Sequence, residues 1–210
     1  MKINIVGVEA LKQSASRVRD IPAALARAEY RAVNAVASTT MTAARRGIAA
    51  EINLPASYIG QQMSLRKARQ SKPEAEIRVR VRHVRLARFA ARQLTAPVKH
   101  MYRSVGDPSR GIPWGRKSAG VSVKVKRAGS REAMRGAFLL PLRAGNADGG
   151  NGMGIFIRVG RAKGAIEHKY GPSPDQLFRR WASTNTGDIQ TKLAAAINSQ
   201  LKYELTGSRR

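Results

Sequence analysis

The side chains that most often carry out chemistry occur in this sequence, but none stands in a catalytic or metal-binding pattern. His83, His100 and His168 lack metal-ligand spacing and have no cysteine or paired carboxylate beside them. Glu74 and Glu76 are the acidic residues that lie close together, and a strand would present both as ordinary solvated charges on one face. The chain has no cysteine, which excludes disulfides and thiolate chemistry. We therefore expect a protein that is not an enzyme and that uses no metal or cofactor.

Two glycine-rich segments come near to phosphate-binding motifs without matching them. Gly106 and Gly111 have the spacing of a P-loop, but Ile112 stands where the lysine is required. The glycines of residues 150–154 lack dinucleotide spacing and precede an expected strand instead of following one. The sequence also contains no Gly-x-Ser-x-Gly motif, the nucleophile elbow of many serine hydrolases. We interpret the glycines as turn and loop residues.

Positive charge is the strongest indication of function. The formal net charge is +26, and residues 65–143 alone contain 21 Lys and Arg against 4 Asp and Glu. A large net charge is evidence about a protein's binding partners and solubility, and it does not indicate the fold. The middle of the chain is therefore expected to face a polyanion, an acidic protein surface, or both.

The candidate contact residues are basic side chains on or next to two expected strands. They are Arg78, Arg80, Arg82, Arg85, Arg88, Lys124 and Lys126. Rows of arginine suit contacts to a phosphate backbone, which position a partner without reading its sequence. Aromatic residues are sparse between these cations, so no base-stacking platform is expected. Nonspecific nucleic-acid binding remains an alternative function, beside contact with an acidic protein.

The elements that must position these cations follow from apolar periodicity. Residues 76–82 alternate Ile77, Val79 and Val81 with three arginines, which predicts a strand. Further strands are expected at residues 2–8, 121–126, 137–142, 155–159 and 165–170, with 137–142 and 155–159 forming a hairpin. Residues 92–120 lack periodicity, and we expect an extended arm or insertion there.

Helices are expected at both ends of the chain. Residues 23–51 carry apolar side chains at helical spacing, and shorter helices are expected at residues 9–19 and 55–60. Gly171, Pro172 and Ser173 form a candidate structural corner that opens a C-terminal helix, in which Asn185 and Gly187 predict an interruption. These elements predict a single α+β domain over residues 1–210, in which a small, mostly antiparallel sheet is packed by the two long helices.

Several stretches occur together in a recognisable order. The expected N-terminal helix contains the pattern Arg-Ala-x-Asn-x-x-Ala at residues 31–37 and is followed by a helical turn and the strand at 75–80. Later come Gly136-Ala-Phe138, the strand at 155–160, and the corner at 170–173. This ordered set resembles the minor tail protein Z family of lambda-like tailed phages, over about residues 20–205. The segments 92–120 and 146–154 depart from the family's pattern.

The resemblance implies a structural virion protein without enzymatic activity, a minor tail or tail-completion component at the head-proximal end of the tail. It implies a homo-oligomeric ring, hexameric by our expectation, that contacts the tail terminator and the neck or head-completion proteins. DNA in the channel is a further possible partner, and another head-tail connector role, head completion, is an alternative. No apolar run approaches the length of about 20 residues that spans a bilayer, so we expect no membrane partner. Assembly is expected in the host cytoplasm.

Overall fold

The computed structural model describes residues 2–6, 22–98, 106–143, 152–162 and 164–207. The chain divides into two compact units. The helical unit comprises residues 1–48, 56–81 and 174–210, and the strand unit comprises residues 49–55 and 82–173. Helices and antiparallel sheets are both present, which confirms the α+β fold class.

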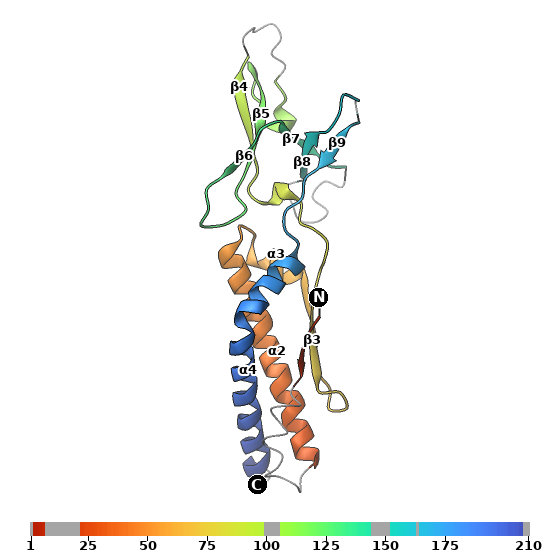
Figure 1. The fold of residues 1–210 in the computed structure, drawn as a ribbon, viewed down its shortest axis with the longest axis vertical. Helices are drawn as coiled ribbons and strands as arrows, with labels where there is room; N and C mark the ends of the chain where they lie inside the picture. Colours follow the sequence, from red (N-terminus) through yellow and green to blue (C-terminus); the bar gives the residue numbers. More distant parts are fainter. Residues whose placement is uncertain (1, 7–21, 99–105, 144–151, 163, 208–210) are drawn as a thin grey trace. The chain divides into compact units, whose positions relative to one another are not determined.

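The helical unit is built from two long helices and one small sheet (Figure 1). Helix α2 (Pro22–Glu51) and helix α4 (Pro174–Gly207) lie side by side, and the short helix α3 (Ala56–Gln61) follows α2 in the chain. Strands β1 (Lys2–Val6), β3 (Glu74–Val79) and β2 (Met63–Arg66) form an antiparallel sheet in the order β1-β3-β2. The expected strand at 2–8 is thus confirmed over Lys2–Val6, whereas the helix expected at residues 9–19 lies outside the described residues.

The core of the helical unit joins α2 to α4 and to β3. Its buried side chains are Ala28, Ala32, Val33, Val36 and Ala37 of α2, Ala68, Ala75 of β3, and Leu193, Ile197 and Leu201 of α4. Alanine on the inner face of α2 lets the neighbouring elements approach closely, because a methyl group occupies little space between backbones. The apolar spacing that predicted a helix at residues 23–51 therefore corresponds to a packed face.

Strand β3 presents Ala75, Ile77 and Val79 to the core and turns Glu76 and Arg78 to the opposite face. The prediction that one strand extends to Arg82 was wrong, because β3 ends at Val79. The N–H group of Arg80 still donates to the carbonyl of Gln62 at 3.0 Å, but Val81 is 62% exposed. The alternation in the sequence thus continues past the point where the sheet buries its apolar side chains.

The strand unit contains two further three-stranded antiparallel sheets. One has the order β4-β5-β6 (Arg92–Pro97, Arg116–Val123, Glu132–Met134), and the other has the order β7-β8-β9 (Ala137–Pro141, Met153–Arg158, Ile166–His168). The short 3-10 helix η1 (Leu86–Arg88) precedes β4 in the chain, and the 3-10 helix η3 (Pro108–Arg110) lies between β4 and β5. The expected hairpin is confirmed as β7 and β8, and the expected edge strand as β9.

Two segments differ from the regular structure that their sequences suggested. Residues 92–120 contain β4 and part of β5, which pair with each other around a register shift at Leu94/Thr95. The function of this segment as an arm stays a prediction. Helix α4 runs without interruption through Asn185 and Gly187, and the Asn185 side chain donates to the carbonyl of Trp181 at 2.8 Å. Packing of α4 against α2 outweighs the weak helix propensity of one glycine.

Candidate functional site

The seven cations singled out in the sequence are divided between the two units. Arg78 and Arg80 belong to the helical unit, and the other five residues belong to the strand unit. They therefore form two separate groups, and their role in binding a partner stays a prediction.

Arg78 already has an acidic partner within the chain. Its Nε donates to Oε2 of Glu76 at 3.0 Å, and its Nη2 lies 2.9 Å from the same oxygen. The side chain of Glu76 is only 8% exposed, so the guanidinium neutralises a carboxylate that is largely removed from water. Arg80 differs, since it is exposed and its Nη1 lies 3.4 Å from Oε1 of Gln62. Arg80 is thus more available to a partner than Arg78.

In the strand unit, backbone pairing brings some of the predicted contact residues together. The N–H group of Lys124 donates to the carbonyl of Phe89 at 2.9 Å, which places Lys124 beside the end of η1, where Arg88 lies. Arg85 forms a backbone bridge with Tyr170, and Lys126 forms one with Ile52. Arg82 is exposed. Three of these five cations, Arg85, Lys124 and Lys126, are therefore held in place by backbone pairing.

The corner at Gly171, Pro172 and Ser173 is closely packed. The N–H group of Gly171 donates to the carbonyl of Val84 at 2.8 Å, and its own carbonyl lies 3.3 Å from Nδ1 of His83. A Cβ atom on Gly171 would lie 2.5 Å from Cε2 of Phe89, whose ring is fully buried. Ser173 is buried, and α4 begins directly after it at Pro174. Only glycine fits this approach of the chain to the Phe89 ring.

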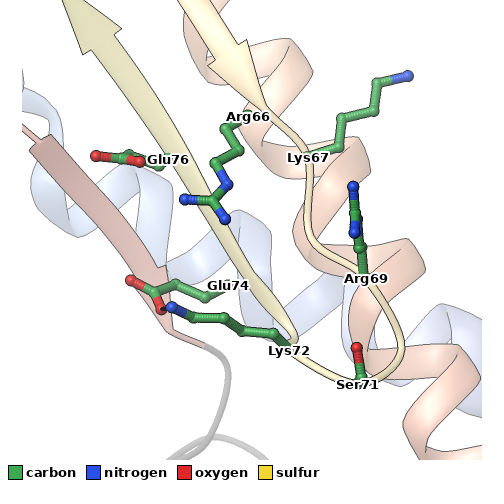
Figure 2. Close-up of a pocket in the computed structure, with 7 residues that line it drawn as sticks. All are labelled: Arg66, Lys67, Arg69, Ser71, Lys72, Glu74 and Glu76. Atoms are coloured by element: carbon green, nitrogen blue, oxygen red, sulfur yellow. Dashed lines mark ion pairs between the residues drawn. The ribbon is translucent and has the colours of Figure 1, made fainter.

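The structure reveals a basic surface that the sequence analysis did not single out. It lies at the turn of the β2–β3 hairpin, residues 66–72, which we call the cationic tip (Figure 2). A hollow of about 190 Å³ at this turn is lined by Arg66, Lys67, Arg69, Ser71, Lys72, Glu74 and Glu76. The signal in the sequence was the density of charge, since four of the seven residues in 66–72 are basic.

Hydrogen bonds fix the conformation of the cationic tip. The side-chain amide of Asn34, on α2, donates from Nδ2 to the carbonyl of Ala68 at 3.0 Å. Its Oδ1 accepts from the N–H group of Ala68 at 2.7 Å. Arg69 and Lys72 exchange two backbone hydrogen bonds of 3.0 Å across the turn. Ala68 is buried between the exposed residues Lys67 and Arg69, so the clamp holds the backbone that carries both cations.

Two carboxylates accompany the cations of the tip. Nζ of Lys72 lies 3.2 Å from Oε2 of Glu74, and Glu76 is the cross-strand neighbour of Arg66. Figure 2 shows Lys72, Glu74 and Glu76 on one side of the hairpin, whereas Lys67 and Arg69 extend from the other side. The hollow therefore combines an excess of positive charge with a local negative contribution.

His168 lies in an aromatic stack of the strand unit. Its ring centroid lies 4.6 Å from that of Phe156 and 4.4 Å from that of Tyr170. Burial lowers the pKa of His168 first, and the positive charge of Arg85 lowers it further. Among the described residues, buried Nε2 of His168 has no hydrogen-bond partner. These surroundings favour a neutral imidazole that contributes packing.

The part of the chain that the structure describes contains no cluster of three or more His, Asp or Glu side chains able to hold a metal ion. None of its described helices is both long and apolar enough to cross a membrane. The arrangement that stands out is instead a charged surface on an α+β scaffold.

Residues 8–210 match the family model described as prophage minor tail protein Z (GPZ). The chain belongs to this family, which confirms the resemblance read from the sequence and indicates a structural role in a phage tail. The comparison with curated proteins gave no match. The comparison with solved structures gave none either.

The residues that carried the resemblance in the N-terminal helix have structural contacts. Ala32 and Ala37 are fully buried in the core, and Asn34 clamps Ala68. Nη1 of Arg31 donates to Oε1 of Glu204, whose other oxygen accepts from Nε of Arg27 at 3.0 Å. This stretch therefore joins α2 to both the β2–β3 hairpin and α4.

Proposed function

We propose that the protein is a tail-completion component at the head-proximal end of a phage tail, and that it acts without catalysis. The match of nearly the whole chain to the minor tail protein Z family carries this proposal. The net charge of +26 supports a role in which many contacts to anionic surfaces hold the protein in place.

In this role the protein forms a ring and contacts the tail terminator and the neck or head-completion proteins. Closed symmetry lets a chain of 210 residues build a collar around a channel. Weak contacts repeated around a ring also reinforce each other, because each further contact is intramolecular once the first has formed. A hexameric ring would match a tail of the same symmetry.

The experiment that tests the tail role is deletion of the gene from an inducible prophage, followed by electron microscopy of the particles. We expect tails that are incomplete at the head-proximal end or fail to join heads, and restoration by the wild-type gene supplied in trans. Normal infectious particles from the deletion strain would contradict the proposal. A defect confined to the head would instead support the head-completion alternative.

Ring formation is tested separately by light scattering during size-exclusion chromatography of nuclease-treated protein at high salt. The expected result is a discrete mass that is a multiple of the 22.9 kDa chain, free of nucleic acid. A monomer that remains a monomer on isolated tails would exclude the ring.

Nonspecific nucleic-acid binding is the second candidate function, and the charge of +26 is the observation that favours it. Binding driven by phosphate contacts weakens steeply as salt rises, because bound counterions are released. Titration of random-sequence duplex DNA at two salt concentrations therefore separates this function from protein assembly. Tight, steeply salt-dependent DNA binding by a protein that is dispensable for tails would favour the second function.

A further inference from the structure

We propose that the cationic tip, residues 66–72, is a docking surface for an acidic patch on a neighbouring protein of the particle. We assign Asn34 as the residue that positions this surface. The inference rests on the proposed function, because it names the surface through which an assembling tail component would meet a partner. The residues of the cationic tip are different from the seven cations that the sequence singled out.

The first observation is that the tip is held in place before any partner arrives. The two hydrogen bonds of 3.0 and 2.7 Å between Asn34 and Ala68 attach the turn to the long helix α2. The pair of backbone hydrogen bonds between Arg69 and Lys72 closes the turn itself. A surface that is ordered in advance loses less conformational entropy on binding, so its contacts contribute more to affinity.

The second observation is that three cations of the tip are free to accept a partner. Arg66, Lys67 and Arg69 are exposed, and within the described residues no ion pair joins them to a carboxylate. Lys72 by contrast is engaged with Glu74 at 3.2 Å. Arginine can bind a carboxylate through two parallel hydrogen bonds, which makes Arg66 and Arg69 suited to aspartate or glutamate side chains.

The third observation identifies the partner as a protein and not a nucleic acid. Glu74 and Glu76 line the same hollow and already pair with Lys72 and Arg78, so a continuous row of phosphates would meet carboxylate acceptors there instead of unpaired cations. Among the described residues that line the hollow, none is aromatic and able to stack on a base. A protein surface can instead place carboxylates opposite the three exposed cations and a hydrogen-bond donor opposite Glu74. Mixed charges of this kind select a partner and fix its register.

The test measures binding of poly-L-glutamate and, separately, of a random-sequence DNA duplex to the full-length protein at physiological salt. The variant Lys67→Glu/Arg69→Glu reverses the two cations that flank Ala68. The control Lys117→Glu/Arg135→Glu makes the same change of net charge at two exposed residues of the strand unit. We expect the tip variant to bind poly-L-glutamate at least about tenfold more weakly, and the control to lose less than about threefold.

A second variant tests the positioning role without changing any charge. Asn34→Ala removes both hydrogen bonds to Ala68, and we expect faster hydrogen exchange at the Ala68 N–H group together with about threefold to tenfold weaker binding of poly-L-glutamate. Faster exchange with unchanged binding would show that Asn34 is structural only and would overturn its assignment.

The remaining outcomes decide whether the cationic tip is a docking surface for an acidic protein. If the tip variant and the control lose equal affinity for poly-L-glutamate, the tip is not a distinct surface and the proposal fails. If the tip variant loses more affinity for DNA than for poly-L-glutamate, the surface belongs to nucleic acid and the proposal also fails. A tip variant that completes tails normally would exclude the tip from assembly, whereas the tail role itself fails only if the deletion strain completes tails.

Discussion

The side-chain amide of Asn34 exchanges two hydrogen bonds with the backbone of Ala68, so that one residue of α2 satisfies both the N–H group and the carbonyl of a residue in the β2–β3 turn. Ala68 is buried, and its backbone groups would otherwise lose hydrogen bonds to water without replacement. The contact connects residues that lie 34 positions apart in the chain. It explains why an asparagine occurs between the buried alanines Ala32 and Ala37 of the same helix.

We predict that Asn34→Ala lowers the free energy of unfolding by about 1–3 kcal/mol, because the N–H group and the carbonyl of buried Ala68 both lose their partner. Urea denaturation followed by far-ultraviolet circular dichroism measures the change. Asn198→Ala is the matched control, since Asn198 is exposed on α4, and it should shift stability by less than about 0.5 kcal/mol. Equal effects of the two variants would contradict the importance of the clamp.

Two glycines within the long helices should respond in opposite directions to the same substitution. A Cβ atom on Gly47 of α2 would lie 2.5 Å from Nε1 and 2.8 Å from Cδ1 of Trp181, so Gly47→Ala must displace the indole and should cost about 1–3 kcal/mol. A Cβ atom on Gly187 of α4 would meet nothing within 4 Å, so Gly187→Ala should stabilise the protein by about 0.5–1 kcal/mol. Thermal denaturation of both variants checks the signs, and a loss of stability in Gly187→Ala would show that α4 needs a glycine there.

The parts of the fold that the sequence predicted well are those where apolar periodicity is strong and local. The helix expected at residues 23–51 was found at Pro22–Glu51, because its apolar residues recur at helical spacing and form the packed face. The β7–β8 hairpin was found because two short apolar runs flank a glycine-rich segment. In both cases the local pattern and the tertiary contacts agree.

The sequence failed where tertiary contacts override local preferences. Gly187 weakens a helix locally, but the packing of Leu193 and Ile197 against α2 keeps α4 continuous. Strand β4, Arg92–Pro97, lacks an alternating pattern and includes a proline, so its pairing with β5 could not be inferred from periodicity. One small sheet was expected, and the described residues form three separate sheets.

The cationic tip shows the limit of sequence reasoning about the site. The basic residues of 66–72 were visible as charge, but charge alone does not distinguish a solvated loop from a surface held in place. The distinction depends on Asn34, which is remote in sequence and resembles any polar residue on a helix. The alternating pattern instead favoured Arg78, whose charge Glu76 neutralises within the chain.

Stability should decrease as the pH falls through the titration range of His168. Burial, and then Arg85, lower the pKa of His168 in the folded protein, so the unfolded chain binds a proton at a higher pH than the folded one. The stabilising contribution is therefore complete above the ordinary histidine pKa of about 6.5 and is lost below it, down to the lowered pKa of the folded state. One proton accounts for at most about 1.4 kcal/mol per pH unit.

The variant His168→Phe keeps a ring between Phe156 and Tyr170 but removes the titrating group. Urea unfolding at several pH values from 7.5 to 5, for the wild type and the variant, isolates the contribution of His168, because the two proteins share every other ionisable group. We expect the difference in stability between the two proteins to change in favour of the variant as the pH falls. A difference that is independent of pH would show that His168 has the same pKa in both states.

Arg78 should have a structural role, whereas Arg80 and Arg82, which follow the end of β3, are candidates for contacts in assembly. Arg78→Gln removes the guanidinium that neutralises Glu76, and we expect it to lower stability by about 1 kcal/mol, since the arginine itself is half exposed and water screens part of the interaction. Arg80→Gln/Arg82→Gln changes two exposed residues and should alter stability by less than about 0.5 kcal/mol. If these arginines contact a partner, the double variant lowers the yield of infectious particles while urea unfolding is unchanged. Normal particle yield from that variant, expressed at wild-type level, would remove Arg80 and Arg82 from the assembly surface.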